Sequence, residues 1–227
     1  VTEWQNYYFD DINSFSYVSM TNIKKNYYGV EFGLDFKLTS FLNFKALGTW
    51  SDAKYINNAN VRYMNSTKAT YTDDIVYNKG MRESGTPLSA YSAILSFHQG
   101  GWFIDINGNY YDRIFLSYAP SRRYGQTLVT ANDVDNDGNF IIPGQAKGNG
   151  GFMLDGSIGK SIYLRHGSLS INLMVSNILN NQKIVSGGYE QSRSDYTLKT
   201  DGSRSDRAYK FSRNVKKYYA NGINGML

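Results

Sequence analysis

Cysteine is absent from this 227-residue chain, and proline is scarce, with three residues. The lack of cysteine excludes disulfide bonds, thiolate metal sites and cysteine nucleophiles. No apolar run approaches the roughly 18 residues that a membrane-spanning helix needs, which excludes a helical membrane protein. The chain begins at Val1, with neither an initiator methionine nor a signal peptide, so we expect a processed protein or a piece of a longer one.

Aromatic residues and glycine are abundant instead: 20 Tyr, 12 Phe and 22 Gly favour strands and turns over helices. Residues 28–50 show the pattern most clearly, because apolar residues occupy every second position on both sides of a short break. These residues are Tyr28, Val30, Phe32, Leu34, Phe36, Leu38, Leu42, Phe44, Ala46, Gly48 and Trp50. The pattern predicts two successive long strands joined by a tight turn.

The same alternation recurs along the chain. Further strands are expected at residues 89–97, 102–110, 152–162 and 169–175, and a seventh from Tyr218 toward Leu227. The alternating segments run for roughly 9 to 12 residues, whereas strands of soluble proteins cluster around 5–6 residues. A tilted strand that spans a membrane needs about 9–11 residues, so the lengths favour a membrane β-barrel.

The connections alternate in length. Short turns are expected at residues 39–42, 98–102 and 163–168, and long polar loops at residues 51–87, 111–151 and 178–217. Short turns at one rim and long loops at the other are typical of bacterial outer-membrane barrels. We interpret residues 1–25 as a further loop.

Charge separates the two faces of the predicted strands. One face carries most of the charges, which are Glu31, Asp35, Lys37, Lys45, Asp105 and Asp155. On the apolar face the only charge is Lys160, near a short turn, where its long stem would let the ammonium reach a membrane interface. Trp102 and Phe41 lie beside short turns, and Tyr28, Trp50 and Tyr110 lie toward the long loops, as in the two aromatic girdles of a barrel.

The predicted fold is therefore all-β: an antiparallel transmembrane β-barrel segment with short periplasmic turns and long extracellular loops. A soluble β-sandwich also alternates, and it is the alternative.

Short motifs resemble one family. Residues 26–33 (NYYGVEFG), 154–160 (LDGSIGK) and 176–181 (SNILNN) resemble the last strands of TonB-dependent outer-membrane receptors. Residues 187–193 (GGYEQSR) and 218–224 (YYANGIN) narrow the resemblance to the starch-utilisation type, the SusC-like receptors. The resemblance covers nearly the whole chain.

The resemblance implies a 22-stranded barrel with an N-terminal plug that imports a bulky nutrient, an oligosaccharide or a peptide. It also implies energy from the TonB complex, a SusD-like surface lipoprotein as a lid, and the outer membrane of a Gram-negative bacterium, with its lipid and lipopolysaccharide, as the location. Residues 1–227 would be the C-terminal portion of the barrel, about its last seven strands, without the plug and the N-terminal barrel strands. The family ends in a strand closed by an aromatic residue, whereas this chain ends at Leu227, so we expect a fragment trimmed at both ends.

One motif suggests a metal. Asp133, Asp135 and Asp137 alternate before Gly138, as in the first half of a calcium loop, but Gly144 stands where the bidentate Glu belongs. The two readings are a calcium site at these three aspartates and an acidic surface turn. No other cofactor is expected.

The long loops suggest binding surfaces. The third is basic, with nine Lys or Arg against four Asp or Glu from residue 179 to 217, which fits an anionic substrate, lipopolysaccharide phosphates or a solvated loop. The loops contain many tyrosines. Their rings could stack on sugars or bind peptides, or they could pack the loops together or against a lid. They are Tyr55, Tyr63, Tyr71, Tyr77, Tyr124, Tyr189, Tyr196 and Tyr209. No substrate-binding residue is singled out.

Catalysis and nucleic-acid binding find no support. The only histidines, His98 and His166, are expected in short turns opposite the long loops, with no nucleophile placed beside them. No nucleic-acid-binding module is recognisable. A nutrient importer is the leading hypothesis and a non-enzyme is expected; a siderophore or cobalamin receptor without a lid, and a soluble β-rich binding or adhesion module, are the alternatives.

Overall fold

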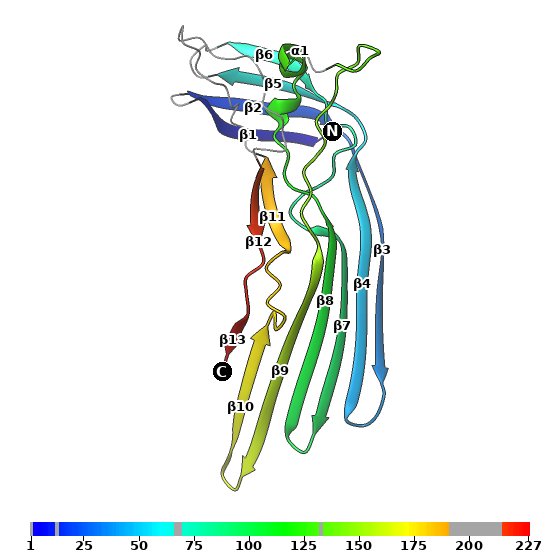
Figure 1. Ribbon diagram of the computed structural model, residues 1–227, viewed down its shortest axis with the longest axis vertical. Helices are drawn as coiled ribbons and strands as arrows, with labels where there is room; N and C mark the ends of the chain where they lie inside the picture. Colours follow the sequence, from blue (N-terminus) through cyan, green and yellow to red (C-terminus); the bar gives the residue numbers. More distant parts are fainter. Residues whose placement is uncertain (1, 12–13, 66–69, 132–133, 191–214) are drawn as a thin grey trace.

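The computed structural model describes residues 2–11, 14–65, 70–131, 134–190 and 215–227 (Figure 1). Long strands run side by side through the lower part of the molecule, and a second sheet lies across their upper end. Within the described residues no helix is long and apolar enough to cross a membrane. The antiparallel, all-β character predicted from the alternation is confirmed.

Seven antiparallel strands make up the main sheet, which we call the long sheet. Their order is β13 (Asn224–Met226), β10 (Gly167–Ser176), β9 (Gly151–Leu164), β8 (Trp102–Ile114), β7 (Pro87–Gln99), β4 (Leu42–Tyr55) and β3 (Lys25–Lys37). Five of them are 13 or 14 residues long, longer than the predicted 9 to 12. The edges are β3 and β13, and each pairs with one strand among the described residues.

The register aligns the apolar positions of neighbouring strands. Leu42 lies opposite Phe97, Phe97 opposite Ile104, Ile104 opposite Ile158, and Ile158 opposite Leu173. Because directly paired residues of an antiparallel sheet share a face, this row is apolar across five strands. A slip of one residue in any pair would turn a whole strand over, so the alternation itself specifies the register.

Tight turns join the strands at the lower end, as predicted (Figure 1). Between β7 and β8 only Gly100 and Gly101 are unpaired, with φ of 58° and 80°. Positive φ at both central residues defines a type I′ turn, whose twist matches that of the hairpin. Gly101 is constrained further, because a Cβ there would lie 2.5 Å from the carbonyl oxygen of Ser161.

The interpretation of residues 1–25 as a loop is wrong. They form β1 (Thr2–Asp11) and β2 (Ser14–Ile23), which join β5 (Ala59–Asn65) and β6 (Tyr71–Val76) in a four-stranded sheet of order β1-β2-β5-β6. Strands β2 and β5 pair although about 40 residues of chain separate them. The alternation within a short segment therefore could not reveal this sheet. Val18 and Met20 of β2 are buried in its core with Val61 of β5.

The three long connections also carry more structure than the predicted loops. The first contains β5 and β6; the second contains a 3-10 helix, η1 (Pro120–Arg123), and α1 (Gly125–Ala131). The third contains β11 (Val185–Glu190) and β12 (Val215–Tyr219), which pair with each other. The predicted seventh strand is accordingly divided: its first part is β12 and its second part is β13.

Candidate functional site: the two faces of the long sheet and its loop end

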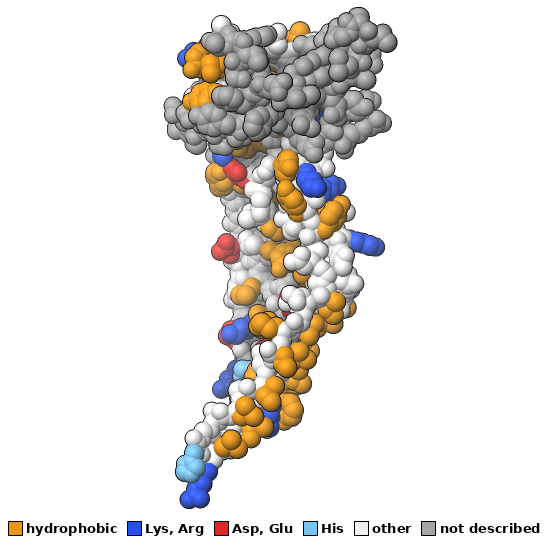
Figure 2. Space-filling view, turned by 90° about the vertical axis from the view of Figure 1, so that its left-hand side faces the viewer, with side chains coloured by type: hydrophobic (Ala, Val, Ile, Leu, Met, Phe, Trp, Pro, Cys, Tyr) orange, Lys and Arg blue, Asp and Glu red, His pale blue; other side chains and the backbone are white. Residues whose placement is uncertain are grey.

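The apolar face of the long sheet is exposed along its whole length. Val30 is 67% exposed, Ile106 47% and Ile171 51%, although all three belong to regular strands. Monomeric soluble proteins rarely expose a contiguous apolar patch of more than a few hundred Å², and larger patches mark protein or membrane contacts. In the lower half of Figure 2, hydrophobic side chains gather along one side, and most of the charged side chains lie on the other.

The opposite face carries a network of polar side chains. Asp105 accepts hydrogen bonds from the hydroxyls of Ser96 (2.5 Å) and Ser157 (3.3 Å) on the two flanking strands. Asp155 accepts from the Asn109 amide (3.0 Å) and from the backbone N–H of Asn177 (2.8 Å). The charged face predicted from the sequence is thus a hydrogen-bonded surface that suits contact with water.

Aromatic rings cover the strand glycines on the apolar face. A Cβ at Gly48 would clash with the ring of Phe32 on one side and would lie 2.8 Å from Tyr91 on the other. A Cβ at Gly108 would lie 3.0 Å from the ring of Phe152. A side chain at either position would therefore displace a neighbouring ring, and the rings restore the apolar surface that glycine lacks.

Aromatic residues also mark the two ends of the apolar face. Toward the loops, the Tyr28 and Trp50 rings have centroids 6.0 Å apart. Toward the turns, the Lys160 ammonium lies 4.8 Å from the centroid of the Trp102 ring and donates to the Gly100 carbonyl at 2.7 Å. The charge of Lys160 thus reaches the turn, as its position near the strand end predicted.

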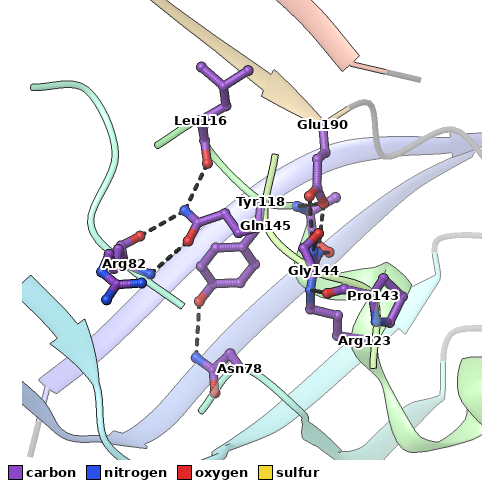
Figure 3. Close-up of polar contacts among 10 residues, drawn as sticks. Asn78, Arg82, Leu116, Tyr118, Arg123, Pro143, Gly144, Gln145 and Glu190 are labelled. Atoms are coloured by element: carbon purple, nitrogen blue, oxygen red, sulfur yellow. Dashed lines mark hydrogen bonds and ion pairs between the residues drawn. The ribbon is translucent and has the colours of Figure 1, made fainter. Parts of the chain in front are cut away.

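A buried ion pair fastens the loop end together (Figure 3). Arg123 of η1 donates to both carboxylate oxygens of Glu190 of β11, at 2.6 and 2.9 Å, and both side chains are at most 1% exposed. Glu190 also accepts from the Ala119 N–H, and the remaining donors of Arg123 reach the carbonyls of Pro143 and Gly144. A buried charge is tolerated when its donors and acceptors are satisfied in this way.

A second set of contacts joins the first and second connections (Figure 3). The Gln145 side chain accepts from the Arg82 N–H (2.7 Å) and donates to the carbonyls of Arg82 and Leu116. Buried Asn78 donates to the Tyr118 hydroxyl at 2.9 Å. Burial raises the pKa of the Tyr118 phenol well above its ordinary value. The loop end is therefore one packed unit built from all three long connections.

Five of the six loop tyrosines that the structure describes pack against other rings. Tyr55 meets Tyr118 edge to face, Tyr63 stacks on Tyr124 at 4.7 Å, and Tyr77 meets Phe140. This supports the prediction that they pack the loops together. Tyr71 is 61% exposed, and Tyr189, beside Tyr218, is 42% exposed. Tyr196, Tyr209 and most of the basic residues of the third connection lie outside the described residues.

Asp135 of the proposed calcium loop is turned toward N–H groups. Its carboxylate accepts from the backbone of Asp137 (3.0 Å) and Asn139 (2.8 Å), which holds its pKa below the ordinary value. Within the described part of the chain no three acidic or histidine side chains are grouped closely enough to hold a metal ion. Asp133 lies outside that part, so calcium at these three aspartates stays a prediction, and the visible geometry is that of an acidic turn.

Both histidines lie at the expected end of the sheet, but His98 belongs to a strand and not to the predicted turn. His98 is near the end of β7, and His166 is in the turn between β9 and β10, both at the end opposite the long connections. What sequence reasoning missed is the buried pair of Arg123 and Glu190. Glu190 belongs to the GGYEQSR stretch, which had pointed only to a family, and no local pattern linked it to an arginine 67 residues away.

Comparison with protein-family models, with curated proteins and with solved structures found no match to this chain.

Proposed function

We propose that this chain is the C-terminal part of the barrel of a SusC-like TonB-dependent outer-membrane receptor, which imports a bulky oligosaccharide or peptide. The observation that carries the proposal is the long sheet, with an apolar face exposed over six strands and a hydrogen-bonded polar face behind it. In a barrel wall the first face would meet lipid and the second a wet lumen.

The dimensions of the sheet support a membrane wall. Between Trp102 and Tyr110 lie eight residue steps of β8, about 26 Å at ~3.3 Å per residue. Barrel strands tilt, which reduces this to about 20 Å, close to the ~25 Å apolar band of outer-membrane barrels. The edges at β3 and β13 would pair with further strands of a 22-stranded barrel, since barrels span membranes only without free edges.

The short turns at one end of the long sheet and the long connections at the other support an orientation in the membrane. The short turns would face the periplasm, and the packed loop end would face outward, where a SusD-like lipoprotein would sit. Exposed Tyr71 and Tyr189 are then available to the lid or the cargo, because tyrosine serves both kinds of contact. Coupling to the TonB complex would depend on a plug outside this chain, so this chain alone would not transport.

Two experiments on the complete protein test the proposal. We expect it in the outer-membrane fraction, extracted only with detergent, with a heat-dependent shift in gel mobility. Native mass spectrometry of the mild-detergent extract should reveal a stoichiometric lipoprotein partner. Recovery from the aqueous fraction would instead support a soluble adhesion or binding module, and a detergent-dependent protein with no partner would favour a siderophore or cobalamin receptor.

A further inference from the structure

A cluster of charges lies at the loop end of the apolar face, beside the tyrosine and tryptophan at its border. Asp52 follows Trp50 by two residues in β4, so both share that face, and the Tyr28 hydroxyl lies 3.4 Å from the Asp52 carboxylate. Arg82 donates to both oxygens of Asp52, at 2.6 and 3.2 Å. Arg113 lies 3.2 Å from the same carboxylate.

Arg113 combines an uncommon backbone conformation with a contact to Trp50 at the border of the apolar face. Its backbone has a φ of 56°, a strained left-handed conformation that is uncommon outside glycine. The guanidinium donates to the Ser51 carbonyl at 2.6 Å and lies 4.9 Å from the centroid of the Trp50 ring. The chain thus accepts a strained residue that places a cation over an exposed aromatic ring of the apolar face.

Positive charge exceeds negative charge here. Asp52 is almost completely buried, with 6% of its side chain exposed, whereas Arg82 and Arg113 remain 28% and 24% exposed. Exposed Lys54 follows Asp52 by two residues, and exposed Lys147 lies 5.3 Å from the ring of Phe115, over which Arg82 also lies. Asp112, paired with Ser89, is a second carboxylate of this border, and the neighbouring Glu83 is paired with Lys25. Lys54, Arg82, Arg113 and Lys147 therefore outnumber Asp52 and Asp112.

We propose that this cluster, defined by Lys54, Arg82, Arg113 and Lys147, binds the phosphate groups of an anionic lipid of the outer leaflet. The inference rests on the proposed function, because it needs the apolar face to lie in a membrane. Guanidinium groups match phosphate oxygens in pairs. A headgroup bound here has its acyl chains directly over the exposed rows that begin at Tyr28 and Trp50, which a free phosphate ion would not use.

The test uses the complete receptor, stripped of lipid in mild detergent and examined by native mass spectrometry. Lipid A bearing two phosphates, the same glycolipid without phosphates, and inorganic phosphate are titrated in parallel. We expect the phosphorylated lipid to bind at least about tenfold more tightly than the dephosphorylated one, since a hydrogen bond to a charged group is worth about 1.5–3 kcal/mol. Equal binding of the two lipids would overturn the proposal.

Two variants localise the binding. Lys54→Gln with Lys147→Gln removes exposed cations without disturbing the buried carboxylate. Asp52→Asn with Arg82→Gln and Arg113→Gln removes the pairing groups together, so that no charge is left buried. Each should reduce the preference for the phosphorylated lipid by about tenfold or more while retaining the heat-dependent gel shift.

The matched control is Arg62→Gln, which breaks an exposed two-point pair with Asp73 on the four-stranded sheet. It should leave the preference unchanged, and an equal loss in this variant would overturn the assignment to the cluster. Competition by inorganic phosphate at the same concentration as the lipid would also overturn it, in favour of an ion site. Failure of the proposed function is distinguishable, because the protein would then be recovered without detergent before any lipid is added.

Discussion

The long sheet and the loop end differ in how much apolar surface they bury. The long sheet buries little: its apolar face is exposed, and its order comes from strand pairing and register. The loop end contains the hydrophobic cores, one around Val18 and Val76 and one around Leu116 and Val185, together with the buried ion pair. The proposed barrel would account for this difference, since lipid would surround the sheet and water the loops. Only the loop end is built like a soluble protein.

Breaking the buried pair should have the largest effect. Glu190→Gln leaves the Arg123 guanidinium buried without a counter-charge, which typically costs about 3–5 kcal/mol. We expect the loop end to open while the long sheet stays protected, measured as hydrogen exchange of the complete receptor in detergent micelles.

The matched control is Asp73→Asn, which breaks the exposed pair with Arg62. It should leave the exchange unchanged, because exposed pairs contribute little. Loss of protection across the long sheet in Glu190→Gln would mean that the two regions are one cooperative unit and that the comparison fails.

A charge on the apolar face should have the next largest effect. Ile106→Arg puts a guanidinium midway between Trp102 and Tyr110, where the cost in a bilayer is about 2–4 kcal/mol. The next residue, Asn107, lies on the polar face and accepts a hydrogen bond from Ser92. Asn107→Arg should be tolerated there. Urea unfolding in lipid vesicles measures both, and equal stability of the two variants would contradict the assignment of lipid to one face.

The turn between β7 and β8 offers a smaller test of the long sheet alone. Gly101→Ala introduces a Cβ 2.5 Å from the Ser161 carbonyl and strains a φ of 80°, a cost of about 1–3 kcal/mol. Gly100 has a φ of 58° but open space around it, so Gly100→Asn should be nearly neutral, since asparagine accepts this conformation. Urea unfolding should separate the two, and similar losses would show that φ, and not the contact with β9, limits this turn.

The two regions also differ in how far the sequence predicts them. Period-two alternation located β3, β4, β7, β8, β9 and β10, because each strand needs only its own pattern and a tight turn to find its partner. Nothing comparable marks the loop end. Val18 lies opposite Tyr63, and Arg123 meets Glu190 across 67 residues. Such contacts depend on how distant segments fold over one another, which a single sequence does not reveal.

The pH dependence of the loop end should be the mildest effect. Burial raises the pKa of Tyr118 in the folded state, and Asn78 donates to its hydroxyl. As the pH rises past the ordinary tyrosine pKa of about 10, Tyr118 therefore loses its proton in the unfolded chain before it does so in the folded protein. The stability that the neutral phenol contributes is complete below that pH and is lost as the pH rises toward the folded pKa. Tyr118→Phe should remove this alkaline loss, at a cost of about 1 kcal/mol at neutral pH for the missing hydrogen bond.

Unfolding of the loop end between pH 8 and 11, followed by hydrogen exchange or limited proteolysis, is the measurement. Tyr71→Phe, at an exposed tyrosine of β6, is the control and should keep the wild-type alkaline profile. The same profile in Tyr118→Phe would assign the alkaline loss to another group. A loss confined to the loop end, with the long sheet unchanged up to pH 11, would sharpen the comparison, because the loop end would then have a titration that the long sheet does not share.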